Sequence, residues 1–374
     1  MRKIGKAQPA GESAYMDTRE MDEGQAPNVH TLKVADNPDG TNDRDIDGLP
    51  EWMDGNDLIA CENDSPEILI AGPDGSEEGA ILRLGSKLVV GGSSKMGKTW
   101  SLIDLGLAVA AGGKWLGHFQ CRQGMVLYVN LELRKHTAGK RMRWIGEKRG
   151  YFRGTGLRPE VSKAIKTWNL RGQCYDLIAM LSTARMRLKD KDAPKFSLII
   201  LDPIYKTYGD KDENSAGDMA ALMLEIEQFA DECNAAIAFA AHFSKGNQSG
   251  KEAIDRISGS GVMARDPDAI ITFTNHEEED CYTLDAVVRE FPPVAPTVMQ
   301  WDAPVMCPRV DLDPTKLRQP GKIKDTFGPR AEAIRQVLDE SSSGEMGSAD
   351  LILRAKAITQ DNHSPGVWKQ SINR

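Results

Sequence analysis

The sequence predicts an α/β fold in which a mainly parallel sheet carries helices on both faces. From residue 80 onward, short apolar runs alternate with longer segments of helical periodicity. The runs are apolar at nearly every position, which is typical of strands that are buried on both faces of a sheet. Strands that alternate with helices favour parallel pairing. We therefore expect a main domain over residues 80–312, long enough to bury a sizeable core.

The individual elements follow from these runs. The first strand is expected at 87–90, where the apolar run ends in two glycines, and a mostly apolar helix is expected at 100–111. A late antiparallel hairpin is expected where Phe291-Pro292-Pro293 separates two alternating segments. The other expected elements are strands at 125–129, 197–201, 237–240 and 270–273, a helix at 219–233, and hairpin arms at 282–289 and 297–301.

The segments outside the main domain have a different composition. Residues 1–48 are rich in Gly, Pro, Asn and Asp and show almost no apolar periodicity, so we expect a disordered acidic tail. Residues 49–79 are expected to be a lead-in segment, and 313–328 a linker. Residues 329–374 predict a small helical unit with candidate helices at 330–338, 348–357 and 364–372. Their spacing fits an incomplete helix-turn-helix unit, and a helical appendage without a nucleic-acid role fits equally well.

The net charge of −8 is unevenly distributed. Residues 1–79 contain 19 acidic and 6 basic residues, whereas the rest of the chain contains 36 acidic and 41 basic residues. An acidic tail therefore precedes a mildly basic body, and the total charge does not exclude a nucleic-acid partner. No apolar run is long enough to cross a bilayer and no signal peptide is evident, so we expect a cytoplasmic protein without a membrane partner. The six cysteines form no C-x-x-C pair and are expected to be free thiols.

One motif carries most of the chemical information. The stretch Gly92-Ser93-Ser94-Lys95-Met96-Gly97-Lys98-Thr99 matches G-x-x-x-x-G-K-[ST], between an expected strand and an expected helix. In such a loop the backbone N–H groups surround phosphate oxygens. Lys98 would reach the β- and γ-phosphates of ATP, and the Thr99 hydroxyl would join the Mg²⁺ shell.

Polar residues follow three of the other expected strands. Asp202 comes directly after a continuous apolar run and is predicted to complete the Mg²⁺ shell, although an acid can also simply end a strand. Glu132 follows the second strand and is our candidate general base, with a surface cap of the next helix as the alternative. His242 follows the fourth strand and is predicted to sense the γ-phosphate, although a lone histidine is usually structural.

These elements together resemble the RecA-like P-loop ATPases, and in particular their RepA-like branch of plasmid replicative helicases and related phage and mobile-element ATPases. The resemblance covers about residues 65–312, and rests on the phosphate loop and on three stretches ending in Glu132, Asp202-Pro203 and Ser258-Gly259-Ser260-Gly261. It implies a RecA-like core, a hexameric ring with ATP bound between subunits, and single-stranded DNA in the pore.

The resemblance also implies DNA contacts and a cation supplied by the neighbouring subunit. The segments 204–214 and 243–260 correspond to DNA-facing loops, in which the candidate contacts are Lys206, Lys245, Lys251 and Arg256. Ordinary solvated loops are the alternative, because neither segment is densely basic. The candidates for the trans cation are Arg265 and Arg289, but Val287-Val288-Arg289 lacks the lysine of the family's Lys-x-Arg pair.

Two functional hypotheses follow from these observations. The first is a Mg²⁺-dependent ATPase ring that acts as a replicative helicase or helicase-like motor, with replication or recombination proteins as further partners. The second is a non-translocating ATP-dependent switch that binds DNA or a protein partner. A small-molecule kinase is a third class, but no segment resembles a lid over an acceptor. A basic stretch over 134–153 fits either a nucleic-acid patch or a solvated helix beside the ATP site.

Overall fold

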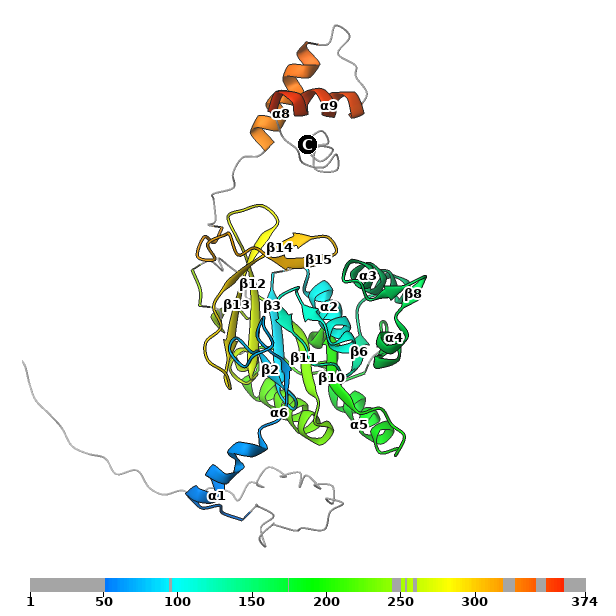
Figure 1. The fold of residues 1–374 in the computed structure, drawn as a ribbon, viewed down its shortest axis with the longest axis vertical. Coiled ribbons are helices and arrows are strands. Elements are labelled where there is room, and N and C mark those ends of the chain that lie inside the picture. Colours follow the sequence, from blue (N-terminus) through cyan, green and yellow to red (C-terminus); the bar gives the residue numbers. More distant parts are fainter. Residues whose placement is uncertain are drawn as a thin grey trace, which may run out of the picture. The chain divides into compact units, whose positions relative to one another are not determined.

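A nine-stranded sheet forms the centre of the molecule, in the order β15-β14-β13-β12-β3-β11-β10-β6-β9 (Figure 1). The computed structural model describes residues 51–93, 96–173, 175–243, 250–252, 254–257, 261–318, 327–340 and 348–359. The chain divides into two units, Met1–Asp64 and Ser65–Arg374, and the sheet belongs to the second unit. The predicted tail at 1–48 lies outside the described residues, as do residues 319–326 of the predicted linker.

Six of the nine strands are parallel to one another and the last three are antiparallel. The sequence predicts a mainly parallel sheet with a late antiparallel pair, but it did not predict β9 or β15. The parallel strands are β3 (Lys87–Gly92), β6 (Met125–Asn130), β9 (Ile165–Asn169), β10 (Phe196–Asp202), β11 (Ala236–His242) and β12 (Ala269–Asn275). The antiparallel strands are β13 (Cys281–Val288), β14 (Thr297–Asp302) and β15 (Val305–Pro308). All the strands that the sequence predicts are therefore present.

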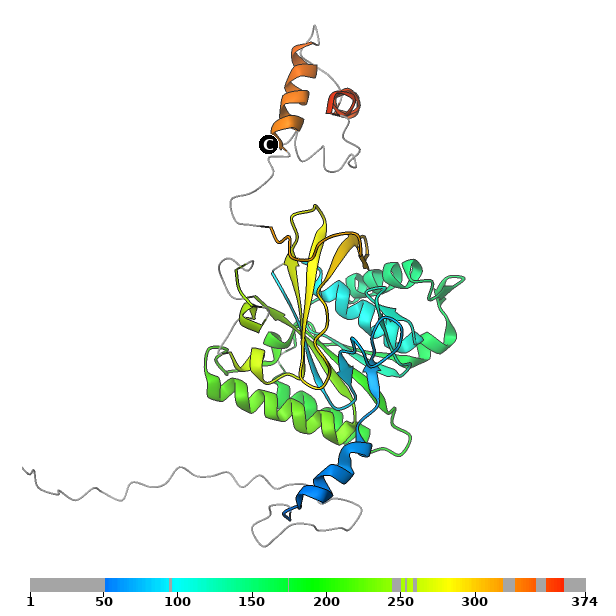
Figure 2. The same cartoon turned by 60° about the vertical axis from the view of Figure 1, so that its left-hand side comes forward.

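Helices cover both faces of the sheet, and α2 and α6 lie on opposite sides of it (Figures 1 and 2). Alternate residues of each strand point to opposite faces. Thus Leu88 and Val90 join one apolar cluster with α2, whereas Val89 joins another with α6. The described helices between β3 and β12 are α2 (Lys98–Ala111), α3 (Lys135–Lys148), α4 (Pro159–Ala164), α5 (Leu177–Leu188), α6 (Ala216–Cys233) and α7 (Val262–Arg265), with short 3₁₀ helices η2 (Ile204–Thr207) and η3 (Ile254–Arg256).

Three small two-stranded sheets flank the central one. Leu69 and Ile70 of the first of these sheets are fully buried in the cluster on the α2 side. The three pairs are β1 (Ile68–Ile70) with β2 (Leu82–Arg83), β4 (Lys114–Trp115) with β5 (Phe119–Gln120), and β7 (Phe152–Arg153) with β8 (Gly156–Leu157). The segment before α2 and the segment after it are thereby anchored on the same face of the main sheet.

Strand β9 and helices α3, α4 and α5 were not predicted as elements, apart from the helical alternative for the basic stretch. β9 reads Ile165-Lys166-Thr167-Trp168-Asn169, and Lys166 and Thr167 are exposed. An edge strand of this kind lacks the continuous apolar run by which the buried strands were recognised. In α3 only Ala138, Ile145 and Gly146 are buried, so most of this helix faces solvent.

The two ends of the described chain contain short helices. In the first unit, α1 (Gly55–Ala60) begins with a capping box between Asp54 and Asp57 and continues into η1 (Cys61–Asp64). Near the C-terminus, α8 (Phe327–Asp339) packs on α9 (Ser348–Thr359) through Ile334, Val337 and Leu351, among others. The third candidate helix, 364–372, lies outside the described residues. None of the described helices has the length and apolar character of a membrane span.

Candidate nucleotide site

Four parallel strands, β3, β6, β10 and β11, end at the same edge of the sheet, and the predicted site residues follow them. A cavity of about 500 Å³ opens there and is lined by Lys98, Thr99, Trp100, Glu132, Asp202 and His242, among others. The carboxyl edge of an open parallel sheet is where α/β proteins bind ligands. The structure thus brings the residues that were predicted from separate parts of the sequence to a single cavity.

The phosphate loop connects β3 to α2. Gly97 caps α2 with a φ of 83°, a left-handed conformation that favours glycine, and so allows the loop to enter the helix at Lys98. The Nζ of Lys98 donates hydrogen bonds to the carbonyl oxygens of Gly92 at 2.6 Å and Ser93 at 3.0 Å. Ser94 and Lys95 lie outside the described residues. Lys98 is therefore held inside the loop that carries it, at the N-terminus of a helix whose dipole favours anions.

The electrostatic environment of Lys98 reflects its burial. Only 8% of the residue is exposed, and burial lowers the pKa of the ammonium group to about 8. The negative charges of Asp202 and Glu132 oppose this shift. A phosphate group placed against Lys98 would favour the charged form further, because an adjacent opposite charge raises the pKa of an ammonium group.

Asp202 is the last residue of β10, and each of its carboxylate oxygens has a different partner. The Thr99 hydroxyl donates to Oδ1 at 3.3 Å, and the Tyr128 hydroxyl donates to Oδ2 at 2.8 Å. Asp202 is 3% exposed, and burial raises the pKa of its carboxyl group to about 6, although the two hydrogen bonds oppose this shift. Sequence reasoning missed Tyr128 as a partner, because a tyrosine inside a buried strand is indistinguishable from a core residue.

Thr99 and Asp202 fit the predicted Mg²⁺ site. Both supply oxygen ligands, which Mg²⁺ prefers, and the two side chains are in direct contact at the cavity wall. Among the described residues no cluster of three or more His, Cys, Asp and Glu side chains could hold a metal ion. Mg²⁺ is commonly bound by one or two protein groups together with substrate phosphates, and Thr99 and Asp202 would be those groups here.

Glu132 lies just beyond β6, in a tight turn that a buried asparagine organises. The side-chain amide of Asn130 donates to the carbonyl of Leu133 at 2.8 Å, and its oxygen accepts the Leu133 N–H at 2.8 Å. The Glu132 side chain is exposed and lines the cavity. Its charge influences the pKa of both Lys98 and Asp202. The carboxylate thus lies beside the phosphate loop. Glu132 is not the N-cap of the next helix, which was the alternative interpretation, because the N-cap of α3 is Arg134.

His242 ends β11 and stands next to the phosphate loop, since His242 pairs with Gly92 in the parallel register of β11 and β3. Its Nδ1 lies 3.4 Å from the Nζ of Lys98, and its ring centroid lies 5.8 Å from that of Tyr205. Partial burial and the positive charge of Lys98 lower the pKa of the imidazole. His242 therefore contacts both the phosphate loop and the segment that follows Asp202.

The basic stretch contributes one side chain to the cavity. Arg141 of α3 lines the cavity wall, and its guanidinium lies over the ring of Trp100, 4.6 Å from the centroid. Trp100 also stacks on Trp144, with 6.3 Å between the ring centroids. Stacking of a guanidinium on an indole holds the cation in place without neutralising it. Nothing in the sequence pattern distinguishes Arg141 from the other basic residues of α3.

Both candidates for the trans cation lie at the opposite edge of the sheet. Asp268 bonds the backbone N–H of Lys87 at the start of β3, and Arg289 forms an ion pair with Asp268 at 3.3 Å. Arg289 also donates to the carbonyl of Arg265 at 2.9 Å. Neither arginine therefore contributes to the cavity of its own chain, and any role in hydrolysis requires a neighbouring subunit.

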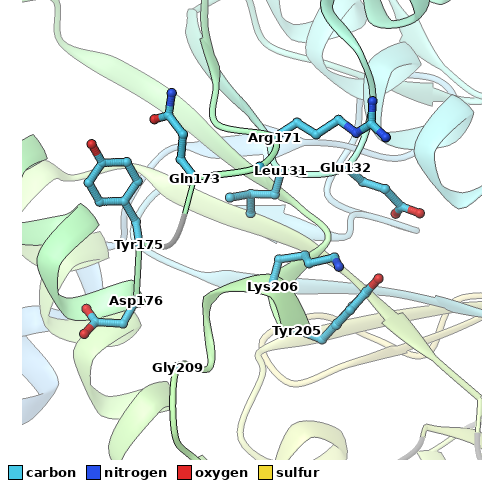
Figure 3. Close-up of a pocket in the computed structure, with 10 residues that line it drawn as sticks. Leu131, Glu132, Arg171, Gln173, Tyr175, Asp176, Tyr205, Lys206 and Gly209 are labelled. Atoms are coloured by element: carbon cyan, nitrogen blue, oxygen red, sulfur yellow. The ribbon is translucent and has the colours of Figure 1, made fainter.

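The four predicted DNA contacts have different environments. Lys206, next to Tyr205, lines a second cavity of about 1050 Å³ that also reaches Glu132 and Arg171 (Figure 3). Lys245 lies outside the described residues, and Lys251 is partly exposed.

Arg256 departs from its predicted role. It is 5% exposed, forms an ion pair with Asp285, and donates to the Thr272 hydroxyl at 3.2 Å. In this structure Arg256 thus joins η3 to β12 and β13 and is not presented to a DNA strand.

Comparison with known proteins places the chain in a family. A family model described as an AAA domain matches residues 51–248, which is more than half of the chain. No curated protein matches the sequence. The matched segment contains the phosphate loop, β6 with Glu132 just beyond it, β10 with Asp202 at its end, and His242. The chain is therefore a member of the AAA domain family and an ATPase of the P-loop class.

Proposed function

We propose that the protein is a RecA-like, Mg²⁺-dependent ATP hydrolase of the RepA-like type, and that it forms a hexameric ring on single-stranded DNA and acts as a replicative helicase or helicase-like motor. The observation that carries the ATPase part is the convergence of Lys98, Thr99, Glu132, Asp202 and His242 on one cavity. These residues come from four strand ends, so their meeting is a property of the fold and not of one local motif.

In the proposed mechanism His242 senses the γ-phosphate, and the other four side chains act on ATP, Mg²⁺ and water. Lys98 transfers its hydrogen bonds from the loop carbonyls to oxygens of the β- and γ-phosphates. Thr99 and Asp202 would hold Mg²⁺, which would neutralise charge on the phosphates when bound. Glu132 accepts a proton from the attacking water. The water oxygen then forms a bond to the γ-phosphorus, while the bond between that phosphorus and the bridging oxygen breaks and ADP leaves.

Arg141 adds a cation on the same side of the cavity as Trp100. Because its guanidinium is held by stacking, it can turn toward a phosphate oxygen at a small cost in side-chain entropy. We include Arg141 among the nucleotide-binding residues of the proposed site.

The DNA-binding part of the proposal rests on the resemblance and on the second cavity. Tyr205 and Lys206 extend from η2 into this cavity, and Arg171 and Tyr175 line it from the segment after β9 (Figure 3). An exposed aromatic ring can stack on a base, and basic side chains can contact phosphates. Tyr205 also contacts His242, so a strand in this cavity would meet a residue that touches Lys98.

Two experiments test the proposal. Lys98→Ala should abolish ATP hydrolysis, and undiminished activity in that variant would reject the site. Native mass determination with ATP and single-stranded DNA should show a hexamer, whereas a monomer under all conditions would reject the ring and with it a trans arginine. The matched control for Lys98→Ala is Lys135→Ala, which removes an exposed lysine from the start of α3 and should leave ATP hydrolysis unchanged.

One observation favours a second candidate, an ATP-dependent switch that binds DNA without translocating. The late hairpin carries Val287 where the helicases have a lysine, and Arg289 is already paired with Asp268. A strand-displacement assay on forked DNA separates the two candidates. The motor should unwind the fork, whereas the switch should hydrolyse ATP without unwinding.

A further inference from the structure

Strand β6 lies between β10 and β9 and presents two polar side chains to the interior at alternate positions, Tyr128 and Asn130. Residues two apart on a strand point to the same face. Tyr128 is 2% exposed and Asn130 is fully buried, so neither polar group can be satisfied by solvent. Buried polar groups need hydrogen-bond partners, and the identity of those partners suggests a task for each residue.

Tyr128 reaches across to the neighbouring strand and holds one oxygen of Asp202. Its hydroxyl donates to Oδ2 at 2.8 Å, while Oδ1 accepts a hydrogen bond from Thr99 at 3.3 Å. The carboxylate plane is therefore fixed by two donors on opposite oxygens. Loss of the tyrosine hydroxyl would leave Oδ2 without its partner and allow the carboxylate to rotate away from Thr99.

Asn130 uses its amide to fix the turn that carries Glu132. Besides its two hydrogen bonds to Leu133, it donates to the side-chain oxygen of Asn169 on β9 at 3.0 Å. The backbone N–H of Leu131 donates to the carbonyl of Asp202 at 3.0 Å, so the same turn is tied to β10 as well. The backbone on both sides of Glu132 is thus held, although the Glu132 side chain itself is exposed.

We infer that Tyr128 and Asn130 are positioning residues of the ATPase site, Tyr128 acting through the metal-binding Asp202 and Asn130 through the turn that bears Glu132. This inference rests on the proposed function of the site. Two residues of the same strand would thus support two different parts of the site. The two variants should consequently fail in different ways, one in metal binding and the other in the hydrolytic step.

Tyr128→Phe removes only the hydroxyl and keeps the ring in the core. We expect the apparent Mg²⁺ concentration for half-maximal activity to rise about tenfold, as the loss of one hydrogen bond to a charged group implies. The same rise should appear in the Mg²⁺ dependence of fluorescent ATP-analogue binding, which needs no turnover. Affinity for the analogue in EDTA and kcat at saturating Mg²⁺ should remain at the wild-type level.

The matched control is Tyr151→Phe, because Tyr151 is also buried but lies against Gly113, beyond the far end of α2. This variant should leave the Mg²⁺ dependence unchanged. An unchanged Mg²⁺ dependence in Tyr128→Phe, or an equal change in both variants, would overturn the assignment for Tyr128.

Asn130→Ala should lower kcat about a hundredfold at saturating Mg²⁺ and ATP, within the range that a positioned general base contributes, with ATP-analogue affinity unchanged. In a Glu132→Gln background it should cause no further loss, because two residues that act through one group are not additive. Asn169→Ala provides a milder variant that keeps the Asn130–Leu133 bonds, and its kcat should lie between those of Asn130→Ala and the wild type. An additive loss in the double variant, or unchanged kcat in both single variants, would overturn the assignment for Asn130.

Glu132→Gln alone separates this inference from the proposed function. If that variant hydrolyses ATP normally, the proposed base is wrong, whatever β6 does. If it is inactive while Tyr128→Phe and Asn130→Ala match the wild type in every readout, the proposed function stands and the inference about β6 is rejected.

Discussion

The Nζ of Lys98 lies 3.4 Å from the Nδ1 of His242, which places the end of β11 in contact with the phosphate loop. The pKa of His242 is lowered by partial burial and by Lys98, while the charges of Glu132 and Glu213 oppose the shift. The lowered pKa favours the neutral imidazole, whose Nδ1 can accept a hydrogen bond from Lys98 when the ring proton is on Nε2. If nucleotide binding moves the Lys98 side chain, the position of the His242 ring should change as well. Tyr205 should respond in turn, because its ring contacts His242.

This contact predicts that His242 couples DNA binding to hydrolysis. His242→Ala should lose most of the stimulation of ATPase activity by single-stranded DNA and keep most of the basal rate at pH 7.5. His242→Gln retains a hydrogen-bond acceptor and should keep part of the stimulation. Steady-state ATPase assays with and without an oligonucleotide measure both effects, and full stimulation in His242→Ala would contradict the prediction.

The stacked Arg141 makes a second prediction. Arg141→Ala should raise the KM for ATP about tenfold, the loss expected when one charge-assisted hydrogen bond to phosphate is removed. Because Arg141 covers Trp100, ATP binding should also change the intrinsic tryptophan fluorescence in the wild type, and less so in Arg141→Ala. Arg143→Ala is the control, since Arg143 is exposed on the same helix. Equal KM values in the two variants would remove Arg141 from the site.

The sequence was sufficient to predict those parts of the fold that depend on a local pattern of apolar residues. Continuous apolar runs identified the buried parallel strands, and residues that follow four of these runs line one cavity, because parallel strands bring their carboxyl ends to one edge of the sheet. Asp202 and His242 are found in this way without knowledge of the strand order.

What the sequence could not supply depends on contacts between distant segments. Arg256 was assigned to a DNA-facing loop by the resemblance to the RepA-like ATPases, but in the structure it forms an ion pair with Asp285 of β13. Similarly, Tyr128 and Asn130 are read as core positions until Asp202 and Asn169 are placed beside them. Pairings of this kind are set by register and packing, which a single sequence does not encode locally.

A buried ion pair between α2 and the end of α3 predicts a large effect on stability. Arg149 donates to both oxygens of Asp104 and also to the carbonyl of Met306, and only 2% of the Asp104 side chain is exposed. Arg149→Met leaves that carboxylate without its partner and should lower the free energy of unfolding by about 3–5 kcal/mol. The double replacement Asp104→Leu/Arg149→Met should cost less, because no unpaired charge remains. Urea unfolding measures both, and a milder loss in Arg149→Met than in the double variant would contradict this account.

Lys87, at the start of β3, predicts a pH dependence of stability. Its ammonium group is 3% exposed and pairs with Glu227 at 2.5 Å and Asp266 at 2.6 Å. Burial lowers the pKa of Lys87, but the two carboxylates outweigh this and raise it above 10.5. A raised pKa means that the contribution is complete below the unfolded value of 10.5 and is lost as the pH rises through the folded value. The difference in unfolding free energy between the wild type and Lys87→Met should thus be constant from pH 7 to about 10 and shrink above it. A difference that grows with pH would contradict a raised pKa of Lys87 in the folded state.

The acidic N-terminal segment makes a prediction about DNA affinity. Residues 1–79 carry 19 of the acidic residues and 6 of the basic ones, and the remaining chain has an excess of basic residues. Residues 1–48 alone hold 10 acidic and 6 basic residues. If DNA binds the basic loops as proposed, we expect this acidic segment to compete with it, and the competition to weaken with added salt because both interactions are screened. Deletion of residues 1–48 should therefore tighten single-stranded DNA binding at low salt and have little effect at high salt. Fluorescence anisotropy with a labelled oligonucleotide measures the DNA affinity. The matched control is a full-length chain in which Asn and Gln replace Asp and Glu within residues 1–48. It should reproduce the tightening if charge is the cause, whereas tightening in the deletion alone would point to steric occlusion by the tail.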